Sequence, residues 1–144
     1  MTAIHQTSQV KPDRQDIVQV MVVDDQPPFR RAARAVVNAT TGFEAVGDAE
    51  SGREALRYAD QVQPDLALID VHMPEMDGFE TARRLTESHP RCVVVLVSLN
   101  ALEFPAAAVA ACGAVAFVRK QELRPAILRS LWYEHRPQRL KPPR

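Results

Sequence analysis

Several features are scarce in this chain of 144 residues, and each scarcity excludes a class of protein. Two cysteines are too few for a disulfide-rich scaffold, and no cysteine and histidine set has zinc-ligand spacing. No apolar run reaches the length of a membrane-spanning helix, and the polar N-terminal stretch lacks the apolar core of a secretory signal. Lys plus Arg equals Asp plus Glu at 18 each, so no net charge attracts nucleic acid or an anionic membrane. We therefore expect a cytoplasmic protein without a membrane partner.

Two nucleotide-binding motifs are also missing. The chain contains no GxxxxGK[ST] loop, which excludes a P-loop site, and no GxGxxG follows its first apolar segment, which argues against a dinucleotide site. Cys92 and Cys112 lie far apart within apolar segments, so we interpret them as reduced, buried thiols. Any phosphate chemistry must therefore use a different set of groups.

The pattern that is present alternates two kinds of segment. Apolar, β-branched runs indicate buried strands, and segments with apolar residues at helical spacing follow each of them. Such alternation predicts a doubly wound parallel α/β sheet. We expect a flexible N-terminal arm over 1–15, one domain over 16–135 and a disordered, basic, proline-rich tail over 136–144. The expected strands are 17–23, 43–49, 64–70, 91–98 and 114–118, and the expected helices are 27–39, 51–62, 77–89, 105–112 and 125–135.

Polar residues stand where four of the five predicted strands end. Asp24 and Asp25 follow the first strand, Asp70 ends the third, Ser98 ends the fourth, and Lys120 lies just past the fifth. Ligands of such sheets bind at the carboxyl ends of the strands, so these side chains should meet at one edge. Three crowded carboxylates repel one another, and Mg²⁺ relieves that repulsion. A hydroxyl and an ammonium beside the metal indicate phosphate, and a carboxylate can itself accept the phosphoryl group.

These segments resemble a known family. The stretches "VVDDQPPFR", "LIDVHMPEMDGFE", "VVVLVS" and "GAVAFVRK" look like the receiver domain of two-component response regulators, over Ile17 to about His135. The resemblance implies a flavodoxin-like, five-stranded sheet in the order 2-1-3-4-5 with helices on both faces. Within the family, the sequence looks closest to the stand-alone, single-receiver type.

The resemblance also implies a role for each residue at the acidic edge. Asp70 is the phosphoacceptor, and Asp25 binds Mg²⁺ directly. Asp24 binds Mg²⁺ through water, and the backbone carbonyl of His72 is a further ligand. Lys120 is the phosphate-binding lysine.

Two further positions are implied to respond to the phosphate. Ser98 stands at the switch hydroxyl position and Phe117 at the switch aromatic position. Leu99 departs from the family pattern, in which a small residue follows the switch hydroxyl. We expect Leu99 on one side and His72 on the other to restrict access to the site.

The function that these features predict is that of a phospho-accepting switch. It takes a phosphoryl group from a sensor histidine kinase or a phosphotransfer protein onto Asp70 with Mg²⁺, and catalyses only its own phosphorylation and dephosphorylation. The face of the fourth helix, fifth strand and fifth helix then binds a downstream protein. We expect no direct DNA binding, and a monomer or weak dimer. Two alternatives stay open: a receiver-like interaction module that is never phosphorylated, and a Mg²⁺-dependent phosphatase with an aspartate nucleophile.

Overall fold

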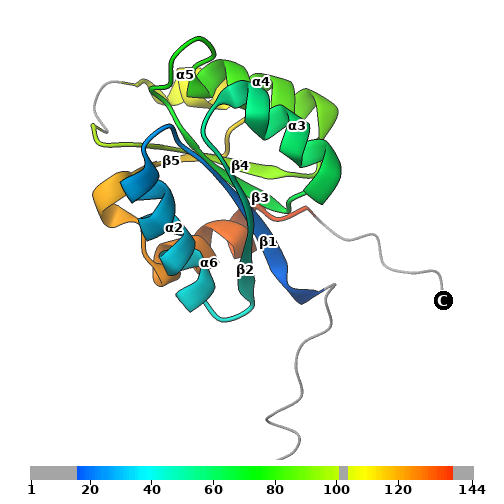
Figure 1. Ribbon diagram of the computed structural model, residues 1–144, viewed down its shortest axis with the longest axis vertical. Helices are drawn as coiled ribbons and strands as arrows, with labels where there is room; N and C mark the ends of the chain where they lie inside the picture. The colour runs from blue at the N-terminus through cyan, green and yellow to red at the C-terminus, as the bar shows by residue number, and fades with distance from the viewer. Residues whose placement is uncertain (1–15, 101–103, 138–144) are drawn as a thin grey trace, which may run out of the picture.

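The architecture is an open parallel sheet of five strands in the order β2-β1-β3-β4-β5. The computed structural model (Figure 1) describes residues 16–100 and 104–137. The predicted fold class and strand order are thereby confirmed. The strands are β1 (Val18–Val23), β2 (Phe43–Ala49), β3 (Leu66–Asp70), β4 (Val93–Ser98) and β5 (Ala116–Arg119).

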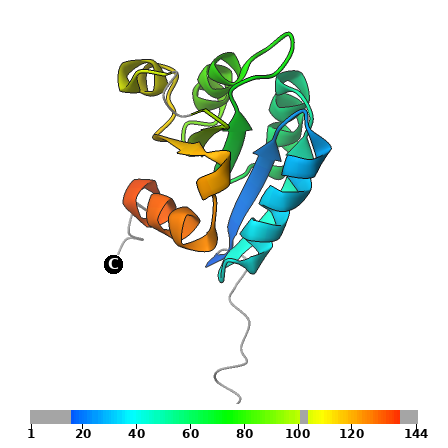
Figure 2. The same cartoon turned by 90° about the vertical axis from the view of Figure 1, so that its left-hand side faces the viewer.

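Helices cover both faces of the sheet, as the side view in Figure 2 shows. The helices α2 (Pro27–Ala39) and α6 (Pro125–His135) pack on one face, and α3 (Gly52–Val62), α4 (Gly78–Ser88) and α5 (Ala106–Ala111) pack on the other. Alternate residues of β1 supply the two cores: Val20 and Val22 face the first pair of helices, and Met21 and Val23 face the other three. Burial on both faces explains why the strands are apolar throughout.

Side-chain caps fix where two of the helices begin. The Ser51 hydroxyl accepts a hydrogen bond from the Glu54 amide at 3.1 Å and so caps α3. The Glu54 carboxylate accepts from the Glu50 amide, whereas a reciprocal capping box would pair it with the Ser51 amide. The Asp77 carboxylate accepts from the Glu80 amide at 2.9 Å at the start of α4. Asp77 therefore ends the loop that follows β3, which places the first turn of α4 beside the end of that strand.

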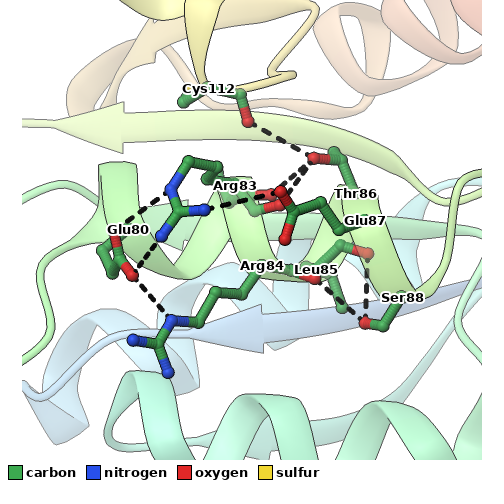
Figure 3. A network of polar contacts seen from close by, with 9 residues as sticks. Glu80, Arg83, Arg84, Leu85, Thr86, Glu87, Ser88 and Cys112 are labelled. Carbon is green, nitrogen blue, oxygen red and sulfur yellow. Dashed lines mark hydrogen bonds and ion pairs between the residues drawn. The ribbon is translucent and has the colours of Figure 1, made fainter.

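The outer surface of α4 carries a network of charged side chains (Figure 3). The Glu80 carboxylate pairs with Arg83 and with Arg84, whose Nε lies 2.6 Å away. Hydrogen bonds from both arginines hold the pKa of Glu80 below its usual value. Such exposed pairs contribute little to helix stability, because water and salt screen them. The network therefore supports α4 locally and lies outside the acidic edge described below.

The ends of some helices and strands differ from those predicted from the sequence. The fifth strand begins at Ala116, two residues later than predicted, and α5 spans only Ala106–Ala111 of the expected 105–112. Ala32, whose spacing places it on the apolar face of its helix, is exposed. Our expectations for 1–15 and 138–144 lie outside the described residues. Within the described ranges no helix is both long and apolar enough to cross a membrane.

Gly78 is required by a close approach between α4 and the end of β3. A Cβ at Gly78 would lie 2.2 Å from the Asp70 carbonyl oxygen and 2.7 Å from the Val71 Cα, and neither backbone atom can move without displacing the strand. The Gly78 amide also donates to the Val71 carbonyl at 2.8 Å. Hence the glycine lets α4 begin directly against the strand that carries Asp70.

We predict that Gly78→Ala lowers the free energy of unfolding by about 1–3 kcal/mol through overpacking. Gly47→Ala is the matched control, because nothing lies within 4 Å of a Cβ at Gly47. Urea unfolding followed by circular dichroism measures both variants. Equal stability of the two variants would show that α4 can shift away from β3.

Candidate functional site

The carboxyl ends of β1, β3, β4 and β5 meet at one edge of the sheet. Asp24 follows β1 directly, Asp70 and Ser98 are the last residues of β3 and β4, and Lys120 follows β5. The strands are parallel and adjacent in the order that the registers show, so the side chains converge although they span most of the domain in sequence. The sequence prediction of a shared edge is thus reproduced in the geometry.

Three carboxylates gather at this edge. Asp24, Asp25 and Asp70 each offer an oxygen, and these oxygens lie within 4.8 Å of one another. The side chains of Asp24 and Asp70 are 0% and 6% exposed, and Asp25 is the most accessible of the three. Burial of several negative charges in one place is costly unless cations compensate them.

Lys120 supplies part of that compensation. Its Nζ lies 2.6 Å from Asp24 Oδ2 and 3.4 Å from Asp70 Oδ1, and its side chain is only 9% exposed. One ammonium facing three carboxylates leaves the cluster with an excess of negative charge. That excess suits a divalent cation bound at the same edge.

The cluster changes the proton affinity of Asp70. Burial and the neighbouring charge of Asp24 raise the pKa of Asp70 from 3.8 to about 6, and Lys120 opposes this rise. Near neutral pH the carboxylate is therefore ionised but only partly stabilised. A metal or phosphoryl ligand at this place would bind a poorly solvated anion.

The donor set fits Mg²⁺ rather than a softer metal. All three groups are carboxylates, which Mg²⁺ prefers, and both cysteines lie elsewhere in the core, where burial raises the pKa of Cys92 to about 12. Asp24 Oδ1 accepts the Gln26 amide at 2.8 Å. Asp24 Oδ2 is buried, accepts no hydrogen bond from any described residue, and has only the Lys120 cation against it. Asp25 and Asp70 could ligate the metal directly with Asp24 behind them.

The loop after β3 brings His72 to the rim of this edge. Its side chain is exposed, and its ring centroid lies 5.6 Å from that of Phe104. The ring therefore packs against Phe104, which precedes α5, and is not a member of the acidic cluster. That its carbonyl binds metal, and that its ring limits access, stay predictions.

Ser98 and Leu99 follow each other at the end of β4 but differ in burial. Ser98 is 1% exposed, and its hydroxyl accepts a hydrogen bond from the Asn100 amide at 3.3 Å. The Leu99 side chain is 63% exposed, and its carbonyl accepts from the Gln121 side chain at 3.3 Å. Gln121 thereby links the segment after Ser98 to the segment after Lys120, and the access role of Leu99 stays a prediction.

Phe117 lies in a row of aromatic rings that sequence reasoning did not foresee. Its centroid is 5.5 Å from that of Phe104, which is also 5.2 Å from Phe79 and 5.6 Å from His72. Phe104 thus joins the loop after β3 to β5. The sequence signal available was a lone aromatic residue before Pro105, and it carries no spacing that would distinguish it from core.

Arg30 is a second residue that sequence reasoning did not assign. Its guanidinium donates to the Asp24 carbonyl at 2.8 Å and pairs with Asp48 at 3.3 Å. It thereby ties α2 to the turn that carries Asp24 and to β2. The arginine in the quoted "VVDDQPPFR" stretch was the only available signal.

A comparison with known protein families agrees with this arrangement of residues. Residues 20–131, more than half of the chain, match the family described as the response regulator receiver domain. The chain belongs to this family.

Several known receiver domains and regulators are similar to the chain. A putative transcriptional regulator of Pseudomonas aeruginosa is 39% identical over 104 residues, which are 72% of this chain and 49% of that protein. The transcriptional regulatory protein YdfI of Bacillus subtilis is 33% identical over 81 residues, 56% of this chain and 38% of that protein. This receiver domain therefore spans half or less of the length of these curated relatives.

Two solved structures share the fold over nearly their whole length. The response regulator domain of Thermotoga maritima CheB superposes with a TM-score of 0.74 and 25% identity, covering 84% of this chain and 99% of that domain. The receiver domain of the putative response regulator NarL of Mycobacterium tuberculosis superposes with a TM-score of 0.71 and 30% identity, covering 81% and 97%. Both superpositions therefore cover more than four fifths of this chain rather than a single motif.

The raised pKa of Asp70 predicts a pH-dependent stability for this receiver domain. The folded carboxyl titrates near 6 and the ordinary value is 3.8, so the folded state holds this proton more tightly than the unfolded chain. The contribution of Asp70 to the free energy of unfolding therefore falls as pH rises from about 4 to about 6.

With a chelator present, Asp70→Asn should be more stable than the unchanged protein at pH 7. We expect a gain of about 1–2 kcal/mol in the free energy of unfolding. The gain should disappear below pH 4, where both forms carry a neutral group. Urea unfolding over pH 4–7 measures it, with exposed Asp16→Asn as control. A gain that is constant over this range would contradict the assignment of the shift to Asp70.

Proposed function

We propose that this receiver domain accepts a phosphoryl group on Asp70 from the phosphohistidine of a sensor histidine kinase or of a phosphotransfer protein. The observation that carries the proposal is the meeting of three carboxylates and one lysine at the edge of the sheet. Asp24 and Asp70 are both buried and both pair with Lys120, but one oxygen of Asp24 is already bound to the Gln26 amide. Asp70, the last residue of the central strand β3, is therefore the nucleophile that we propose. Membership of the receiver family supports the same role.

The proposed step is an in-line displacement at phosphorus. A carboxylate oxygen of Asp70 forms the new P–O bond while the P–N bond of phosphohistidine breaks, and its electron pair stays on the imidazole nitrogen, which takes up a proton. Asp70 must be ionised to attack, and its pKa of about 6 allows this near neutral pH. Lys120 neutralises one phosphoryl oxygen, and the Ser98 hydroxyl can donate to another.

Mg²⁺ is the cofactor that we propose for this step. Asp25 and Asp70 would hold it directly, with Asp24 through water and the carbonyl of His72 as a further ligand. When bound, it neutralises the carboxylates and the incoming phosphoryl oxygens, which would otherwise repel each other. Asp24 stays bound to the Gln26 amide throughout, which keeps its second oxygen directed at the cluster.

We propose that phosphorylation changes the face formed by α5, β5 and α6. Ser98 would move toward the phosphoryl group, and Phe117 would fill the space released. Phe104 packs against Phe117 and against His72, so a ring displaced at one end of this row affects the other. Such a packed element with two discrete arrangements spreads a local change of charge.

Access to the phosphoryl group is a further part of the proposal. Leu99 follows Ser98 at the rim and His72 follows Asp70 by two residues, so both can narrow the approach of water or of a small donor. A narrow approach would give slow loading and a long-lived phosphoryl form.

The proposed readout is a protein partner on the α5–β5–α6 face. We propose no direct binding to DNA, no enzymatic activity beyond the protein's own phosphorylation and dephosphorylation, a monomer or weak dimer, and a cytoplasmic location. We also propose that the receiver unit is 16–135. The experiments below separate this role from an unphosphorylated interaction module and from a phosphatase.

Incubation with acetyl phosphate and Mg²⁺ should add one phosphate to the chain, as intact mass spectrometry will show. Asp70→Asn and a chelator should each abolish the addition, because one removes the nucleophile and the other the metal. The matched control is Asp65→Asn, since Asp65 precedes the opposite end of the same strand and holds the Gln19 amide at 2.8 Å. Continuous release of phosphate from a generic ester would instead indicate a phosphatase, and no addition would indicate an unphosphorylated module.

Binding of beryllofluoride, a phosphoryl mimic, should shift backbone amide signals in α5, β5 and α6 as well as beside Asp70. Phe104→Leu should weaken the shifts in α5 and β5 because it interrupts the row of rings. Phe43→Leu is the control, since Phe43 lies on the opposite edge strand. Two-dimensional amide NMR records the shifts. Changes confined to the neighbourhood of Asp70 would contradict a switch and favour a phosphate carrier.

A further inference from the structure

An aromatic ring lies against the ammonium group of Lys120. Phe29, in the first turn of α2, places its ring centroid 4.5 Å from Lys120 Nζ. The ring is half-buried and packs against the core cluster between the sheet, α2 and α6. Lys120 itself is 9% exposed, so little water competes for its charge. The contact is therefore a cation–π interaction in a largely desolvated setting, where such contacts are strongest.

The ring can orient the ammonium without using its hydrogen-bond donors. Lysine carries three N–H donors on a flexible stem of four carbons. In the structure Nζ faces Asp24 at 2.6 Å and Asp70 at 3.4 Å. A phenyl face attracts the charge but offers no oxygen, so the ring does not compete with the carboxylates, or with whatever replaces them, for the N–H donors of the ammonium. A polar residue at this position would compete for one of those donors.

The first turn of α2 is itself anchored to the acidic edge. Pro27 and Pro28 begin the helix with restricted backbone angles. The Gln26 amide donates to Asp24 Oδ1 and the Arg30 guanidinium to the Asp24 carbonyl, both at 2.8 Å. Phe29 lies between these two residues, so its ring is fixed relative to the carboxylate with which Lys120 pairs.

We propose that Phe29 is a positioning residue that holds the Lys120 ammonium at the place where it receives a phosphoryl oxygen. The inference rests on the proposed function for its catalytic consequence, but the contact itself is independent of phosphorylation. Without the ring, the lysine stem samples more rotamers, and the ammonium is correctly placed for a smaller fraction of the time.

Two variants separate the charge effect of the ring from its bulk. Phe29→Leu keeps an apolar side chain but removes the π face, and Phe29→Tyr retains the face. Val36→Ala is the control for general damage to α2, because Val36 lies two turns further along the helix and packs against the same core cluster. Circular dichroism and urea unfolding of all three full-length variants report their folding.

The first readout uses the small number of lysines. The chain has only three, Lys11, Lys120 and Lys141, so ¹³C-lysine labelling gives few Cε–Hε signals. Protons above a phenyl face are shifted upfield, so one lysine should show an upfield Hε signal in the metal-free protein. That signal should return to the usual position in Phe29→Leu and stay upfield in Phe29→Tyr and Val36→Ala.

The second readout is the rate of phosphorylation by acetyl phosphate at saturating Mg²⁺. We expect Phe29→Leu to be roughly three- to tenfold slower, which corresponds to about 0.7–1.4 kcal/mol and lies in the lower part of the range for cation–π contacts. Phe29→Tyr should stay within about twofold of the unchanged protein. A rate that is retained in Phe29→Tyr and in the packing control Val36→Ala but lost in Phe29→Leu would assign the effect to the ring over Lys120. An unaltered lysine spectrum in Phe29→Leu, or equal slowing in Leu, Tyr and the Val36→Ala control, would overturn the proposal. If the unchanged protein takes up no phosphate, the proposed function fails, and the lysine spectra still test the contact.

Discussion

The structure depends on one ammonium group shared between two buried carboxylates. Asp24 and Asp70 end two adjacent strands at the middle of the sheet and would repel each other if nothing lay between them. Lys120 arrives from the far edge strand and pairs with both. Because Asp24 follows β1, Asp70 ends β3 and Lys120 follows β5, the pairing requires these three strands to be in place in the sheet. The same contact therefore links the correct topology to a complete site.

Lys120 compensates the carboxylates incompletely, and we propose that this makes the edge reactive. A fully neutralised cluster would leave Asp70 with the ordinary proton affinity of a surface carboxyl and no demand for a further cation. Instead burial and Asp24 outweigh Lys120, so that Asp70 is an ionised but poorly solvated group near neutral pH. Such a group gains from any cation or electrophile that removes its charge. Negative charge that folding leaves incompletely compensated at this edge would thus favour the binding of a metal ion or a phosphoryl group.

Sequence reasoning located the edge but not the residues that orient it. The strand order and the meeting of Asp24, Asp70, Ser98 and Lys120 were predictable, because runs of buried strand residues end at those positions and parallel strands share their carboxyl edge. The roles of Phe29 and Phe104 were not predictable. An apolar residue at helical spacing or before a proline has the same sequence pattern whether it packs in a core or against a functional group. The expectation that Ala32 is buried was wrong for a related reason. Spacing indicates which face of a helix is apolar, but not how far the sheet beneath that face extends. The predicted ends of α5 were wrong because a run of alanines contains no polar or capping residue that marks where the helix begins and ends.

The two faces of the sheet differ in how firmly they are fastened to this edge. On the α2 side, Arg30 joins Asp24 to Asp48, and Phe29 packs on Lys120, so that face is coupled directly to the charges. On the other side, α5 has six residues, and among them only Val109 is buried. A segment with so little burial moves at small cost in free energy. The proposed change of charge at Asp70 would therefore be resisted where α2 is anchored and accommodated where α5 and the Phe104–Phe117 contact can shift, which would give the proposed rearrangement its direction.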